Sequence, residues 1–123
     1  MSVVRSNIFT EIDLEAIKGD TFSPPVIILL GGLDLSSFHE AILTVRKRAT
    51  DIDTLLVLTL DAGIQIETTI EDYEVISNDI TLYANYADME IPEGVYVYDM
   101  QVKEENEKYT ILCGKFTIFQ DVT

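Results

Sequence analysis

The chain has 123 residues, 47% of them hydrophobic, and its 22 Asp and Glu against 8 Lys and Arg give a formal net charge of −14. This length predicts a single domain, residues 1–123, and the hydrophobic content excludes a disordered chain. A surface of this sign repels phosphate groups, so we expect no nucleic acid and no membrane among the partners.

The N-terminal segment reaches acidic residues before any continuous apolar core, so no signal peptide is predicted. The longest apolar run, Val26 to Leu30, is far shorter than the ~20 residues that a membrane-spanning helix needs. We therefore expect a soluble protein made in the cytoplasm. Residues 1–7 are predicted to form a loose N-terminus and residues 120–123 a C-terminal tail.

Short β-strands are predicted in the first half of the chain. From Thr10, three acidic residues alternate with Ile12, Leu14 and Ala16, which is typical of a half-buried strand. Residues 21–25 contain two prolines, which cannot donate to a ladder, so this half of the segment is predicted to be an edge or a bulge. The run from Val26 to Leu30 that follows suits a strand covered on both faces. Residues 40–48 alternate with a period of two, and their β-branched side chains favour a strand over a helix capped by Ser37.

The middle of the chain continues the pattern. Strands are predicted over residues 55–60 and 64–70, each with clear alternation. Residues 71–74 are acidic and turn-like. Residues 75–84 are predicted to form a hairpin around a Ser77-Asn78-Asp79 turn, because these three residue types favour turns.

The last third, residues 91–119, predicts a long β-hairpin. Tyr96, Tyr98, Met100 and Val102 share one face of its first strand, a polar turn covers residues 104–108, and a second alternating run follows. Seven or eight short strands at regular spacing, with little helix, predict an all-β sandwich or a small barrel.

No catalytic motif is present in this sequence, and we expect no cofactor and no enzyme. Its single histidine, His39, and single cysteine, Cys113, do not suggest a nucleophile and base pair, and one cysteine cannot form an internal disulfide. Loop carboxylates at residues 51–53 and 71–72 could hold calcium, and six tyrosines could bind carbohydrate. A soluble carbohydrate- or calcium-binding module is therefore the alternative function.

The second face of the last hairpin is more apolar than a solvated face should be. An apolar second face is commonly a contact surface for another subunit, although a loop or terminus of the same chain could cover it. The predicted partner interface consists of Val95, Val97, Ile111, Cys113 and Phe119.

Three pieces of the sequence occur in an order that resembles a known family. They are residues 18–22 (KGDTF), residues 33–36 (LDLS) leading to 41–47 (AILTVRK), and residues 91–102 (IPEGVYVYDMQV) with 114–118 (GKFTI). The ordered set is similar to small virion proteins of tailed bacteriophages, in particular to the N-terminal domain of baseplate upper proteins. The resemblance runs from about Lys18 to the end of the chain.

The resemblance implies an immunoglobulin-like β-sandwich of about seven or eight antiparallel strands that acts as a structural building block. It implies a virion protein that anchors fibre, neck, tail or baseplate components to the particle, as a homo-oligomer or a ring-bound subunit among other virion proteins. The family brings no catalytic residues. The chain departs from the pattern at Pro24-Pro25 and lacks the long fibre segment of a baseplate upper protein, so head fibre, neck and tail positions fit equally well.

Overall fold

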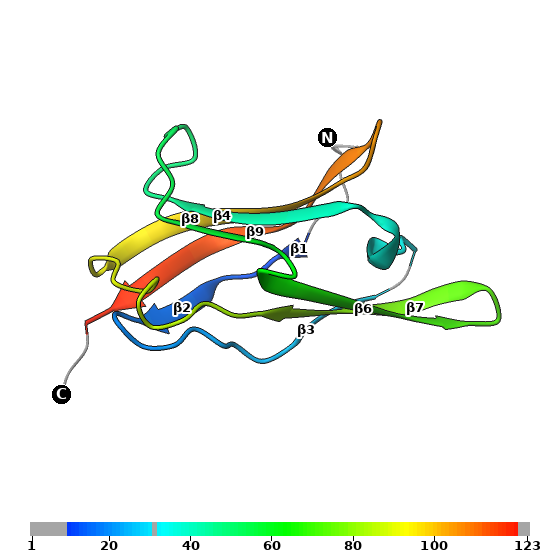
Figure 1. Cartoon of the computed structure of the whole chain (residues 1–123), viewed down its shortest axis with the longest axis horizontal. Coiled ribbons are helices and arrows are strands. Elements are labelled where there is room, and N and C mark those ends of the chain that lie inside the picture. Colours follow the sequence, from blue (N-terminus) through cyan, green and yellow to red (C-terminus); the bar gives the residue numbers. More distant parts are fainter. Residues whose placement is uncertain (1–9, 31, 121–123) are drawn as a thin grey trace, which may run out of the picture.

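Nine strands in two layers build the part of the chain that the structure describes, residues 10–30 and 32–120 of a computed structural model (Figure 1). The larger layer holds β1 (Thr10–Glu11), β2 (Leu14–Ile17), β9 (Lys108–Phe119), β8 (Gly94–Lys103), β4 (Glu40–Arg46) and β5 (Leu56–Leu60). The smaller layer holds β6 (Gly63–Glu71), β7 (Glu74–Leu82) and β3 (Ile27–Leu30). A single 3-10 turn, η1 (Leu35–Ser37), precedes β4. The predicted loose N-terminus and residues 121–123 of the predicted tail lie outside the described residues.

The strands follow the order β1-β9-β8-β4-β5-β6-β7-β3, with β2 also on β9. A short pairing of β5 with β6 links the two layers. Most pairs are antiparallel as predicted, but β5 with β6 and both β1 and β2 with β9 are parallel. Parallel strands of a regular sheet need a long connection, and residues 18–107 separate β2 from β9. β5 and β6 are joined by only two residues, and their parallel pairing is limited to two residue pairs.

This strand order is that of an immunoglobulin-like β-sandwich. In the usual lettering, β9-β8-β4-β5 correspond to strands G, F, C and C′, and β3-β7-β6 to strands B, E and D, the arrangement of variable-type domains. The predicted fold class is therefore confirmed. The core between the layers includes an aromatic cluster in which Phe116 contacts Phe22 and Tyr98, with ring centroids 5.1 and 6.4 Å apart.

Tyr96 forms the tyrosine corner that is characteristic of this fold. It lies near the start of β8, the F strand, and its hydroxyl donates to the carbonyl of Pro92 at 2.5 Å. Two residues later, where antibody domains carry the second cysteine of their disulfide, this chain has Tyr98. The Tyr98 ring is buried and its hydroxyl donates to the carbonyl of Ile12, so a hydrogen bond ties the N-terminal strands to β8 at this position.

The predicted hairpin over residues 75–84 is wrong, because β7 runs without a break from Glu74 to Leu82. The chain instead turns at Asp72 and Tyr73, which both have positive φ, within the acidic segment that was predicted to be turn-like. Asn78 lies in the middle of β7 and is 2% exposed. A buried asparagine that is fully hydrogen-bonded is as compatible with a strand as an apolar residue is.

Strand β3 is an edge strand rather than a strand covered on both faces. In the described part of the chain it pairs with β7 alone, at the end of the strand order. Ile27 is buried, whereas Ile28 is 59% and Leu30 81% exposed. The run of apolar residues predicted two covered faces, but the residues that the structure describes cover only one. The strand predicted at residues 40–48 is confirmed as β4, which ends at Arg46.

Candidate functional site

The surface that the sequence singled out is the outer face of the larger layer, the face turned away from β3, β6 and β7. On β8 and β9, residues that alternate with the core positions point to this face. Val95 is 61% and Phe119 47% exposed there, and Val97 and Cys113 are half-buried. Four of the five predicted contact residues therefore share one face.

Ile111, the fifth predicted contact residue, does not belong to this face. It is 2% exposed and lies in the core. The register explains the difference: Met100 pairs with Leu112, but the next residue, Gln101, pairs with Thr110, so Ile111 is an extra residue on β9. Such a bulge turns two consecutive side chains toward the same side, and here both Ile111 and Leu112 are buried.

Three exposed apolar side chains form what we call the apolar patch: Ile17 on β2, Phe119 on the adjacent strand β9, and Val95 on the next strand, β8. Ile17 pairs directly with Phe119, and Val95 pairs with Thr117, two residues before Phe119 on the same face. Ile17 is 44% exposed. The sequence carried a signal for it, because Ile17 continues the alternating positions of the acidic face of the first predicted strand.

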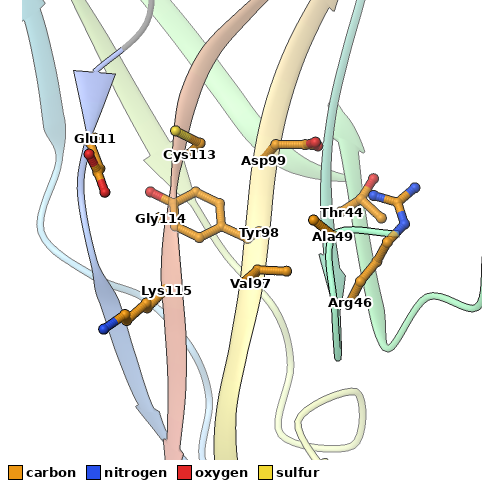
Figure 2. Close-up of a pocket in the computed structure, with 10 residues that line it drawn as sticks. All are labelled: Glu11, Thr44, Arg46, Ala49, Val97, Tyr98, Asp99, Cys113, Gly114 and Lys115. Carbon is orange, nitrogen blue, oxygen red and sulfur yellow. The ribbon is translucent and has the colours of Figure 1, made fainter. Parts of the chain in front are cut away.

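A hollow of about 340 Å³ lies beside the apolar patch, toward the middle of the outer face. Asp99 lines it, and in the register of the sheet Asp99 lies between Thr44 on β4 and Cys113 on β9. Figure 2 shows the side chains around it, with Arg46 on one side and Lys115 on the other. The hollow is lined by Glu11, Thr44, Arg46, Ala49, Val97, Tyr98, Asp99, Cys113, Gly114 and Lys115.

The floor of the hollow depends on a close approach between β9 and the N-terminal strands. A Cβ atom at Gly114 would collide with the carbonyl oxygen of Ile12, so only glycine fits there. The Asp13 carboxylate accepts the N–H of Lys115 at 3.0 Å. Burial, and secondarily the nearby Cys113 and Asp13, raise the pKa of the Tyr98 hydroxyl well above its usual value. These contacts join β9 and β8 to the N-terminal strands below the hollow.

The outer face carries no recognisable catalytic set. His39 is exposed and immediately precedes β4, and the first residue of β4 pairs with Lys103 on β8. Cys113 on β9 pairs with Asp99, four residues earlier on β8. The four-residue offset along β8 is about 13 Å, and β4 and β9 lie on opposite sides of β8, so the two side chains are too far apart to act together. Among residues 10–30 and 32–120, no group of three or more His, Cys, Asp or Glu side chains lies close enough to hold a metal ion.

Exposed tyrosines do not form a row either. Tyr73 is fully exposed at the tip of the β6–β7 hairpin, whereas Tyr83 and Tyr86 follow the other end of β7. Tyr96 and Tyr98 are buried. A planar platform for a sugar is therefore not assembled from these side chains. In the described part of the chain, no helix has the length and hydrophobicity that crossing a bilayer requires.

The chain matches no protein-family model and no curated protein. Among solved structures, a match covers 96% of this chain and 95% of the BTLA ectodomain, with a TM-score of 0.40 and 12% sequence identity. The fold assignment rests on the strand order and on the tyrosine corner formed by Tyr96.

Proposed function

We propose that this protein is a structural subunit of a tailed-bacteriophage particle, in which its immunoglobulin-like domain joins neighbouring virion proteins and catalyses no reaction. The observation that carries the proposal is the apolar patch. Sheet faces that meet water are polar, and a contiguous group of exposed apolar side chains on a sheet marks a contact surface. The ordered sequence pieces at residues 18–22, 33–47 and 91–118 connect this contact surface with virion proteins.

The composition of the outer face supports a protein partner. Apolar side chains lie beside a hollow that contains both signs of charge, Arg46 and Lys115 with Glu11 and Asp99. Protein interfaces combine an apolar centre with a polar rim in this way. The net charge of −14 disfavours nucleic acid and anionic lipid as the occupant of the same face. The protein would be made in the host cytoplasm and carried in the virion.

The test is mass spectrometry of purified particles from the phage that encodes this chain, with the infected-cell lysate as reference. The proposal expects peptides of this chain in the particles at stoichiometric abundance. Particles that lack the chain while the lysate contains it would refute the proposal.

A second experiment tests whether the apolar patch is the surface that contacts other virion proteins. Phe119→Lys places a charge in the apolar patch and should abolish incorporation into particles, because the side chain is exposed and the fold does not need it. Tyr83→Lys is the matched control: Tyr83 is aromatic and similarly exposed, at 52% against 47%, but it follows β7 in the other layer. Equal incorporation of both variants would exclude the apolar patch as the contact.

A further inference from the structure

Within residues 10–30 and 32–120, no strand lies against the second edge of β3, and this edge is apolar. Among these residues β3 pairs with β7 alone, so every second residue from Ile27 to Leu30 directs its backbone N–H and C=O away from the described sheet. On the outer side of this strand, Val26, Ile28 and Leu30 are 50%, 59% and 81% exposed. Most natural sheets blunt such an edge with charges, a bulge or a covering loop. Here Pro24 and Pro25, which have no backbone N–H to donate, prevent strand pairing only before Val26.

This edge is also the uncharged part of a highly charged chain. No Asp, Glu, Lys or Arg occurs between Thr21 and Leu33, although the whole chain carries 22 acidic and 8 basic residues. Asp79 and Glu67 are the nearest acidic residues on β7 and β6, one and two strands behind the edge. Two copies with a net charge of −14 each repel each other over most of their surfaces. The electrostatic repulsion is smallest where the surfaces that meet carry no charge.

We propose that β3 pairs antiparallel with β3 of a second copy of this chain about a twofold axis. The smaller layers of the two copies, three strands each, then become one continuous sheet. The occupant of the edge is a second copy because the segment is its own complement: it is apolar throughout, offers backbone groups on one side only, and needs no partner charge. Twofold pairs of identical surfaces are the commonest form of association between identical chains.

Side-chain alternation and the length of the apolar segment together select the register. Alternation allows an axis through any one residue of β3, and an axis through Ile28 is the one that opposes all five residues from Val26 to Leu30 to one another. An axis through Ile28 sets Ile28 opposite its own counterpart, Val26 opposite Leu30 and Ile27 opposite Leu29. Directly opposed residues share a face and have Cβ atoms about 4.5–5.5 Å apart. The exposed side chains of Val26, Ile28 and Leu30 therefore contact their counterparts and shield one another from water. A shift of one residue would instead oppose outward to inward side chains.

The β3 pair rests on the proposed function in one respect only, which is that the chain is a subunit of an assembly. Light scattering after gel filtration of the full chain should give twice the 13.8 kDa of one chain. Raising the salt concentration should strengthen the pair, since salt screens the repulsion between two acidic copies. A wild-type chain that stays at 13.8 kDa at high micromolar concentration and high salt overturns the proposal.

Ile28→Lys places two like charges directly opposite each other on the axis and should halve the measured mass with an unchanged circular dichroism spectrum. Ile52→Lys is the matched control, because Ile52 is 93% exposed in the loop after β4 and makes the same charge change away from β3. A variant Ile28→Lys that remains a dimer assigns the contact to another surface and overturns the proposal.

Cross-linking tests the register. In a Cys113→Ser background, Ile28→Cys should form a disulfide between copies under mild oxidation, and Ile52→Cys should not. Cross-linking at equal rates for both would overturn the pairing through β3. The two proposals fail separately: a monomer that is nevertheless found in particles refutes only the β3 pair, and a dimer absent from particles refutes only the virion role.

Discussion

Asn78 offers the sharpest test of this fold, because it lies in a predicted turn but is buried in the middle of β7. Its side-chain oxygen accepts the N–H of Leu35 at 3.1 Å and the hydroxyl of Thr68 at 2.7 Å, and its side-chain amide donates to the carbonyl of Leu33 at 2.9 Å. Asn78 thus fastens the segment before β4 to the smaller layer. Asn78→Ala removes all three hydrogen bonds and leaves backbone groups of Leu33 and Leu35 without this partner.

At about 1 kcal/mol for each hydrogen bond, Asn78→Ala should lower the free energy of unfolding by about 3 kcal/mol. In urea, with a slope of about 1–3 kcal/mol per molar for a domain of this size, the midpoint should fall by about 1–3 M. Ser77→Ala is the control, because Ser77 is half-buried and points to the other face of β7, and it should shift the midpoint little. An Asn78→Ala cost below about 0.5 kcal/mol, typical of exposed sites, would refute the buried position.

Three further predictions follow from the contacts described above. Ile111→Lys should unfold the domain, because Ile111 is buried and the substitution places a charge in the core. Phe119→Lys should leave the midpoint of urea unfolding nearly unchanged, because Phe119 is exposed. Equal midpoints for the two variants would contradict the bulge in β9. Gly114→Ala should lower the free energy of unfolding by about 1–3 kcal/mol, because the added Cβ atom would collide with the backbone of Ile12. Thermal or urea unfolding measures this change. An unchanged free energy of unfolding would contradict the close approach of β9 to Ile12. Burial raises the pKa of the Tyr98 hydroxyl in the folded state, so its contribution to stability is complete below pH 10 and falls as the pH rises above that value. Tyr98→Phe should therefore reduce the loss of stability that the wild-type chain shows above pH 10. An unchanged dependence of stability on pH would contradict the burial of the hydroxyl.

Alternation along single strands was enough to predict most of the larger layer. The core face of β8, from Tyr96 to Val102, was predicted correctly because the period of two is a local property of the strand. The bulge at Ile111 could not be predicted in the same way, because it depends on how β9 is registered against β8. The two consecutive apolar residues Ile111 and Leu112 were the only local signal for it.

Turn chemistry misled the prediction where a polar side chain has a buried role. Ser, Asn and Asp favour turns because their side chains bond to nearby backbone groups. Asn78 uses the same capacity over a long range, on Leu33 and Leu35, and the partners of such a bond are not visible in a local window. The true turn, at Asp72 and Tyr73, has positive φ at both residues without a glycine, so the strongest hairpin signal was missing.

The five apolar residues from Val26 to Leu30 link the sequence to the two proposals. Their composition predicts coverage on both faces that residues 10–30 and 32–120 of one copy do not provide, and in the proposed pair the second copy provides it. Pairing through β3 uses the smaller layer and leaves the apolar patch of the larger layer free on both copies. A pair with two such patches binds a symmetric or repeated surface as a bivalent unit, and the second contact then forms at a high effective concentration. In the proposed virion role, a patch of only three exposed apolar side chains, which binds weakly when alone, can in this way hold the subunit on a particle that presents its binding sites in rings.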